Sequence, residues 1–342
     1  IRDVAVTGVQ TCALPIFEHL EFVDVLPFTP DAEKRDPNTQ EEGNTLAADP
    51  KNRVFVVYLD IPHVSYEGAY RTRQPLVTAL NRILAPNDLF GVMTTDMRPR
   101  DLVFGRKVLT TEDMLSRYWF WGRRDTILRT PEEQVLEFCT RNPQTGDPLR
   151  ARDGAADRPL VDILLERQRE DKVLTHLESV VDYLGMIRET RTSLLVFTEG
   201  WVLFEPDPAL LVPMQNLAGY PKTPAMGTMP GGRVGIATTP QQGSASACLT
   251  EVRRLSELSD GARYRALIQR AARANVVFYP VNPLGLTVFD FPINADIALG
   301  PDPRQSMLMW NIDRVRGRED ALREAASNTG GIAVVSNNKL EV

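Results

Sequence analysis

The chain has few of the residues on which most catalytic sites depend. It contains three histidines and three cysteines among 342 residues. The short motifs of common enzyme chemistry are also missing: there is no Gly-x-Ser-x-Gly, no Gly-Lys-Ser/Thr phosphate loop, no His-Glu-x-x-His and no Cys-x-x-Cys. With few general bases and none of these motifs, we expect a protein that is not an enzyme.

Basic charge and long apolar runs are lacking as well. The formal net charge is -6, and no segment approaches the roughly 18 apolar residues of a membrane helix. Nucleic acids and anionic membranes attract proteins through a basic field. The sequence therefore indicates no nucleic-acid partner and no membrane span. A content of 43% hydrophobic and 25% charged residues is typical of a globular domain.

Residues 1–16 stand apart from the rest of the chain. Residues 6–16 read as the translation of a common sequencing adapter, so residues 1–16 are expected to be non-native. Without Cys12, which lies in this segment, the cysteines are Cys139 and Cys248. Two cysteines are too few for a disulfide scaffold or a thiolate metal cluster, but they allow one disulfide.

Short apolar strands alternate with amphipathic helices in the remaining sequence. Runs of apolar and β-branched residues, typical of a parallel sheet buried on both faces, predict strands at 54–59, 89–95, 193–197, 275–282 and 332–335. Helical periodicity predicts helices at 75–84, 160–188, 251–274 and 319–328. This alternation predicts an α/β fold with a doubly wound, mostly parallel central sheet and helices on both faces.

The sequence divides into a flank and one domain with insertions. Residues 17–52 combine a short apolar piece with polar, proline-containing sequence, which predicts a flanking strand and linker. The domain is expected at 53–342. Stretches without sustained periodicity predict long loop insertions at about 116–158, 201–250 and 283–316, the first with a short helix near 131–138.

Polar side chains lie where the buried strands end. Asp60 follows the first strand, and His63 and Ser65 come shortly after it. Asp96 follows the second strand and Glu199 the third. In open α/β sheets, ligands bind beyond the carboxyl ends of the strands. These five residues are therefore candidate binding residues.

The densest aromatic cluster is Tyr-Trp-Phe-Trp at residues 118–121, inside the first insertion. Aromatic side chains often anchor interfaces, so Trp119 and Trp121 are candidate partner-binding residues. The alternative is that these rings fasten the insertion to its own domain.

These residues resemble a known family. Four sequence segments are similar to the von Willebrand factor A (VWFA) domain, in a bacterial VWFA-related branch common in acidobacteria. They are Tyr-Leu-Asp-x-x-His-Val-Ser, Gly-Val-Met-Thr, Tyr-Trp-Phe-Trp-Gly-Arg-Arg-Asp and Thr-Glu-Gly-Trp. The resemblance covers roughly residues 53–342. It implies a Rossmann-like fold, a protein-binding or adhesion function, and an exported bacterial protein that is secreted or otherwise extracytoplasmic.

The resemblance also implies a metal site, which this sequence alters. A typical VWFA domain binds a divalent cation such as Mg²⁺ or Mn²⁺ through Asp-x-Ser-x-Ser, a later threonine and a second aspartate. Asp60 and Glu199 match the two acidic positions. Pro62 and Val64 occupy the serine positions and offer no side-chain oxygen. Because hard cations need clustered oxygen ligands, the site is expected to be degenerate and no cofactor is expected.

We therefore expect a non-enzymatic interaction module that binds an unidentified protein through loops at the carboxyl edge of the sheet. One alternative is a metal-dependent, hydrolase-like site built from four side chains, which are Asp60, His63, Asp96 and Glu199. It requires these side chains to converge on one ion. A second alternative is a purely structural domain of a larger exported protein, which predicts no partner-sized apolar patch around Trp119 and Trp121.

Overall fold

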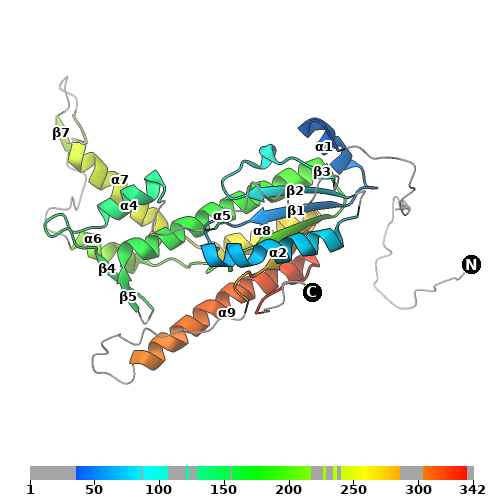
Figure 1. The fold of residues 1–342 in the computed structure, drawn as a ribbon. Coiled ribbons are helices and arrows are strands. Elements are labelled where there is room, and N and C mark those ends of the chain that lie inside the picture. Colours follow the sequence, from blue (N-terminus) through cyan, green and yellow to red (C-terminus); the bar gives the residue numbers. More distant parts are fainter. Residues whose placement is uncertain are drawn as a thin grey trace, which may run out of the picture.

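The chain folds into a mixed α/β structure with a projecting arm, as Figure 1 shows for the computed structural model. The residues described are 36–85, 88–106, 121–122, 129–154, 156–216, 226–228, 234–236, 240–285 and 303–336. The adapter-like segment and Trp119 lie outside this set. Within it, no helix combines the length and the apolar composition that crossing a membrane would require.

A five-stranded sheet of order β3-β2-β1-β6-β9 forms the centre of the fold. Its strands are β1 (Val54–Leu59), β2 (Leu89–Thr94), β3 (Gly105–Arg106), β6 (Thr192–Phe197) and β9 (Val276–Val281). The four long strands are parallel, and β3 is antiparallel to β2. Every residue of β1 and β2 is buried, which explains their uninterrupted apolar sequence. The α/β class and the mostly parallel sheet are confirmed.

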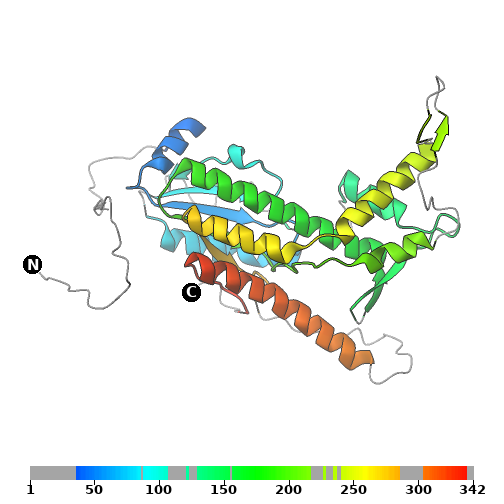
Figure 2. The same cartoon turned by 180° about the vertical axis from the view of Figure 1, so that it is seen from behind.

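Several helices pack on one face of the sheet (Figure 2). They are α1 (Gln40–Ala48), α5 (Leu160–Ile187), α8 (Asp260–Arg273) and α9 (Pro303–Thr329). Alternate strand residues such as Val56 and Tyr58 point to this face and share a core with Leu177 and Leu267. The strand period of two thus divides the apolar run of β1 between two cores.

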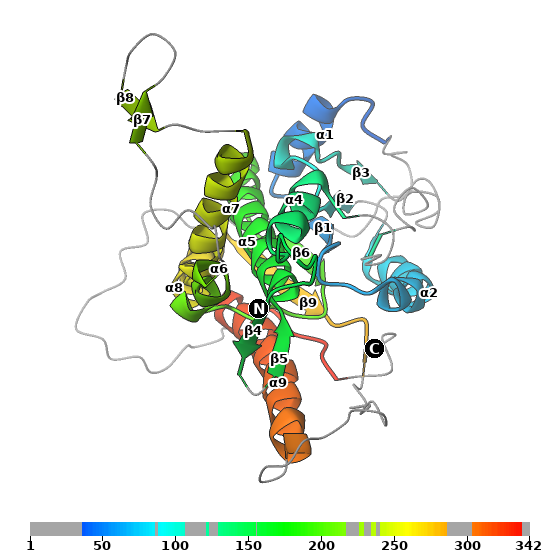
Figure 3. The same cartoon turned by 90° about the vertical axis from the view of Figure 1, so that its left-hand side faces the viewer.

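The opposite face of the sheet carries α2 (Tyr66–Ile83), as Figure 3 shows. Phe55 and Val57 of β1 pack with Leu76 and Leu80 of this helix. The helix begins earlier than its apolar periodicity predicted, because Ser65 caps it by accepting a hydrogen bond from the backbone N–H of Gly68.

Beyond the carboxyl edge of the sheet, the first turns of α5 support a projecting arm (Figures 1 and 2). The 28 residues of α5 span roughly 42 Å, which is longer than the strands. The other elements of the arm are α4 (Pro131–Cys139), β4 (Arg150–Asp153), β5 (Ala156–Pro159), η2 (Pro208–Leu211), α6 (Val212–Gln215) and α7 (Pro240–Ser256). Leu164, Leu210 and Val252 belong to a separate apolar core within it. The arm is therefore a packed unit.

A disulfide between Cys139 and Cys248 joins α4 to α7 within the arm. Their Cα atoms are 6.1 Å apart, inside the usual range for a disulfide. The pairing that the sequence left open is thus formed. The predicted insertions also contain the short hairpin β7 (Met226–Thr228) and β8 (Val234–Ile236).

Some predicted boundaries were wrong because tertiary packing decides them. Residues 40–48 of the predicted linker form α1, whose Ala47 is buried in the sheet core. The helix predicted at 251–274 is divided, because α7 packs in the arm core and α8 in the sheet core. The helix α9 begins at Pro303, inside a predicted insertion. The strand predicted at 332–335 makes a single bridge, from Val334 to β9.

Candidate functional site

Asp60 is the centre of a buried polar network at the carboxyl edge of the sheet. It follows β1 directly and is 0% exposed. The Thr198 hydroxyl and the Trp201 indole N–H donate to Asp60 Oδ2 over 2.8 Å and 3.1 Å. Nδ1 of His63 lies 3.0 Å from Oδ2 and 3.2 Å from Oδ1. Both carboxylate oxygens are therefore engaged by donors of the chain itself.

Glu170 of α5 lies on the other side of His63. Its Oε2 is 3.4 Å from Nε2 of His63 and accepts a hydrogen bond from the backbone N–H of Val202 over 3.1 Å. The Glu170 side chain is 1% exposed. Among the described residues, its Oε1 has no hydrogen-bond partner. An imidazole between two carboxylates is favoured in its doubly protonated, positively charged form.

Burial and mutual attraction set the charges in this network. Burial opposes the charged form of His63, but the carboxylates of Asp60 and Glu170 together outweigh burial and raise the pKa of His63. Burial raises the pKa of Glu170 to about 7, although the nearby His63 acts in the other direction. Glu170 is therefore poised to exchange a proton close to neutral pH.

We expect the free energy of unfolding to fall as the pH rises from about 5 to 8, because of Glu170 and His63. Glu170 keeps its proton up to a pKa of about 7 when folded, against an ordinary glutamate pKa of 4.5 in the unfolded chain. The folded state therefore holds more protons between these values, and a shift of this size lowers stability by roughly 3 kcal/mol across the window. The raised pKa of His63 acts in the same direction. Its contribution to stability is complete below pH 6.5, the ordinary pKa of histidine, and is lost as the pH rises through the raised pKa.

Urea unfolding at several pH values measures this dependence. Glu170→Gln should flatten the curve, since glutamine does not titrate. The buried Glu166 carboxylate should not add to the pH dependence. Arg158 and Arg314 overcome its burial and hold its pKa near 2, so it stays ionised from pH 5 to 8. A wild-type stability that rises over this range would contradict the prediction.

Glu199 and Ser65 hold the start of α2. Oε1 of Glu199 accepts a hydrogen bond from the backbone N–H of Ser65 over 2.6 Å. Gly68 permits this close approach, because a Cβ at this position would lie 3.0 Å from Glu199 Oε1. A carboxylate beside the free N–H groups of a helix N-terminus is stabilised by them. Both residues therefore have a local structural role.

Asp96 lies apart from the network. Its side chain is 59% exposed and pairs with Nζ of Lys172 over 2.5 Å. The structure thus brings Asp60 and His63 into contact and places Asp96 at the surface. The convergence on one ion that the hydrolase-like alternative requires is not seen.

The residues around Asp60 do not fit a divalent cation. Mg²⁺ needs several oxygen ligands in a tight octahedral arrangement, whereas Asp60 is surrounded by N–H and O–H donors. Pro62 contributes no side-chain oxygen, and Val64 is buried in the apolar core below α2. In the described part of the chain, no group of three or more His, Cys, Asp or Glu side chains has the geometry of a metal site.

Trp121 is buried, while Trp119 lies outside the described residues. Trp121 is 4% exposed and belongs to the apolar core on the α2 face. Gly122 follows it with a φ of +102°, a conformation that favours glycine. Trp121 thus fastens its insertion to its own domain. The large exposed apolar side chains of the described residues include two on α4 of the arm, where Val135 is 63% and Phe138 81% exposed.

Sequence reasoning did not select Glu170, Thr198 or Trp201. For Glu170 a signal existed: it lies three residues before Val173 and four before Leu174, on the buried stripe of α5. A charged residue on such a stripe needs a partner. Trp201 gave no comparable signal, because the direction of its indole depends on the path of the chain after β6.

The resemblance to VWFA domains rests on the residues of the chain itself. Asp60 and Glu199 stand beyond the ends of the adjacent parallel strands β1 and β6, as the resemblance to VWFA domains implies. Pro62 and Val64 depart from that resemblance. Comparisons of the chain with protein-family models, curated proteins and solved structures found no match, so membership of the VWFA family is a prediction.

Proposed function

We propose that the protein is a non-enzymatic interaction module of the VWFA type, with a doubly wound domain that binds a protein partner without a divalent cation. One observation carries the proposal: the imidazole of His63 lies between Asp60 and Glu170. In a cation-dependent VWFA domain, positive charge at this edge comes from the ion. Here the imidazolium of His63 supplies the positive charge, so the carboxylates at this edge are balanced without a metal ion.

The arm is the surface best suited to the partner. It stands beyond the carboxyl edge, and the disulfide between Cys139 and Cys248 ties its helices together. Val135 and Phe138 are one helical turn apart on α4, so their exposed apolar groups form one patch. Exposed aromatic groups on a rigid support are typical interface anchors. The disulfide also fits an oxidising compartment, in line with the proposed exported location.

The hydrolase-like alternative has less support. Asp96 is paired with Lys172 at the surface, and Glu199 accepts a hydrogen bond from the start of α2. A nucleophile beside His63 is also without support, because the Ser65 hydroxyl caps α2. No observation favours a catalytic role over the interaction module.

Partner capture tests the proposed function. Immobilised protein would be incubated with an extracellular extract of the producing organism in buffer with EDTA or with Mg²⁺. We expect the same proteins to be retained in both buffers and at least tenfold less to be retained by Phe138→Asp or Val135→Asp, because a buried charge opposes apolar contact.

Met186→Asp is the matched control for this experiment. Met186 is 78% exposed and lies at the opposite end of α5, far from the arm. Its substitution should leave retention unchanged. Retention that depends on Mg²⁺ and is lost in Asp60→Ala would contradict a cation-free module. Equal retention by all arm variants would contradict the arm as the binding surface, and the absence of specific retention by the wild-type protein would favour the purely structural domain.

A further inference from the structure

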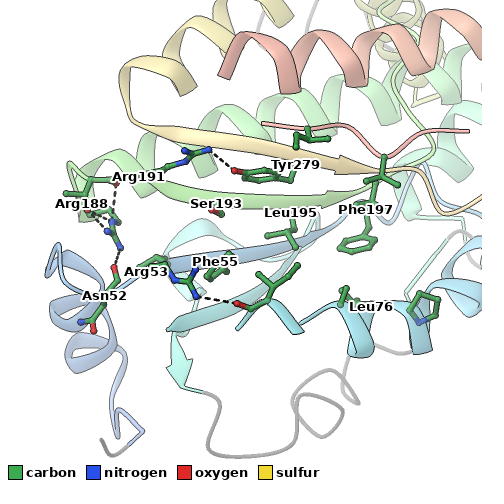
Figure 4. Close-up of a pocket in the computed structure, with 18 of the residues that line it drawn as sticks. Asn52, Arg53, Phe55, Leu76, Arg188, Arg191, Ser193, Leu195, Phe197 and Tyr279 are labelled. Carbon is green, nitrogen blue, oxygen red and sulfur yellow. Dashed lines mark hydrogen bonds between the residues drawn. The ribbon is translucent and has the colours of Figure 1, made fainter. Parts of the chain in front are cut away.

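An apolar groove of about 690 Å³ lies on the α2 face of the sheet (Figure 4). Helix α2 forms one wall, and Ile332 and Val334 line the other. The floor consists of side chains from β6 and β9, which are Leu195, Phe197, Tyr279 and Val281. The six residues of each strand make this floor roughly 20 Å long.

The position of the groove is unusual for a parallel sheet. Such sheets are found almost always with both faces covered by helices. On this face, within the described part of the chain, α2 packs over β1 and β2, where Leu80 shares a core with Phe90. Beside it, the side chains of β6 and β9 line the groove. Two strands are about 10 Å across, which matches the diameter of one helix.

Positive charge lies at one end of the groove, where β6 begins. Arg188 donates hydrogen bonds to the backbone oxygen of Asn52 and to Thr190, and Arg191 donates to the Tyr279 hydroxyl over 2.6 Å. These partners are neutral oxygens. Among the described residues, neither guanidinium has a carboxylate within ion-pair distance. The end of the groove therefore favours a ligand that brings negative charge.

The geometry points to an amphipathic α-helix as the occupant, with an acidic C-terminal turn beside Arg188 and Arg191. A helix has a partial negative charge at its C-terminus, which fixes its direction as antiparallel to the strands. A floor of this length accommodates about 13 residues at 1.5 Å each. Its apolar stripe would cover the partly exposed Tyr279, Val281 and Ile332, and its polar side would face solvent. An alkyl chain in this open groove would keep one side in water.

A displayed library of 16-residue helical peptides tests this inference. The apolar positions of one face are randomised, and the last turn carries either two glutamates or two lysines. We expect selection on the wild-type protein to enrich acidic-ended amphipathic peptides at least tenfold over basic-ended ones. Ser193→Trp places an indole on the groove floor and should abolish this enrichment. Ala79→Trp, on the α2 wall, serves the same purpose if Ser193→Trp does not fold.

Charge reversal distinguishes a specific contact from general apolar adhesion. Arg191→Glu should invert the preference towards basic-ended peptides, because the end of the groove then attracts positive charge. Arg270→Glu is the matched control, since Arg270 pairs with Asp182 on the other face of the sheet. This variant should keep the preference for acidic-ended peptides.

Four results would overturn the inference. The first is that no amphipathic sequence is enriched. The second is an enrichment that persists in a folded Ser193→Trp or Ala79→Trp variant. The third is saturable binding of dodecanoate that Arg191→Glu abolishes, which would assign the groove to an alkyl anion. The fourth is a wild-type dimer in light scattering that Ser193→Trp dissociates, which would make a second copy the occupant.

Discussion

Asp60→Ala is expected to lower the free energy of unfolding by about 3–5 kcal/mol, the usual cost of breaking a buried charge pair from one side. The substitution leaves the Trp201 indole N–H and the Thr198 hydroxyl without their acceptor, and each such group costs roughly 1–3 kcal/mol. It also leaves His63 with one carboxylate neighbour. Urea unfolding monitored by tryptophan fluorescence measures the change.

The sign of this effect separates two roles for Asp60. A carboxylate that mainly serves a metal ion repels its acidic neighbours when the ion is absent, so its removal would stabilise the protein. A carboxylate that accepts three internal contacts is part of the framework, and its removal destabilises. Asp96→Ala is the control, because its exposed pair with Lys172 contributes less than about 1 kcal/mol. Unchanged or raised stability of Asp60→Ala would contradict the framework role.

Loss of the disulfide is expected to destabilise the arm by about 4–5 kcal/mol. Cys139 and Cys248 are 109 residues apart, and in the chain-entropy relation a cross-link over a loop of that length has an effect of this size. The arm has its own apolar core, so it can open without the sheet. In Cys139→Ala/Cys248→Ala, hydrogen exchange should accelerate in α4 while β1 and β6 keep their protection.

Chemical reduction provides the control for this variant. Cys248 is 3% exposed, so its replacement by alanine also removes buried sulfur. Wild-type protein treated with dithiothreitol keeps the sulfur atoms and lacks the bond. We expect faster exchange in α4 for both samples. Full protection of α4 after verified reduction would contradict a stabilising role of the disulfide.

The sequence predicted the sheet and α5 well because their signals are local. Strands buried on both faces have uninterrupted apolar sequence, as β1 and β2 do. The stripe from Val173 to Leu184 marks the buried side of α5. The division between α7 and α8 has no such signal, because it reflects two cores that only the folded chain defines.

The sequence predicted where the candidate site lies, but it did not predict what its residues do. Asp60 follows a buried strand, which is enough to put it at the carboxyl edge of the sheet. Its role depends on what surrounds it. Trp201, which donates to Asp60, is 141 residues away along the chain. His63 is three residues after Asp60, and its imidazole turns back towards the Asp60 carboxylate. The resemblance supplied the expected ligands, and Pro62 and Val64 were the sequence signal that the chemistry differs.

The continuity of α5 has a mechanical consequence. The helix is unbroken for 28 residues, with one end in the arm core and the other over the sheet. Glu170 lies where α5 passes from the sheet to the arm, and its carboxylate is next to His63. A force applied to the arm is therefore transmitted to the His63 imidazole through one continuous helix, without an intervening loop.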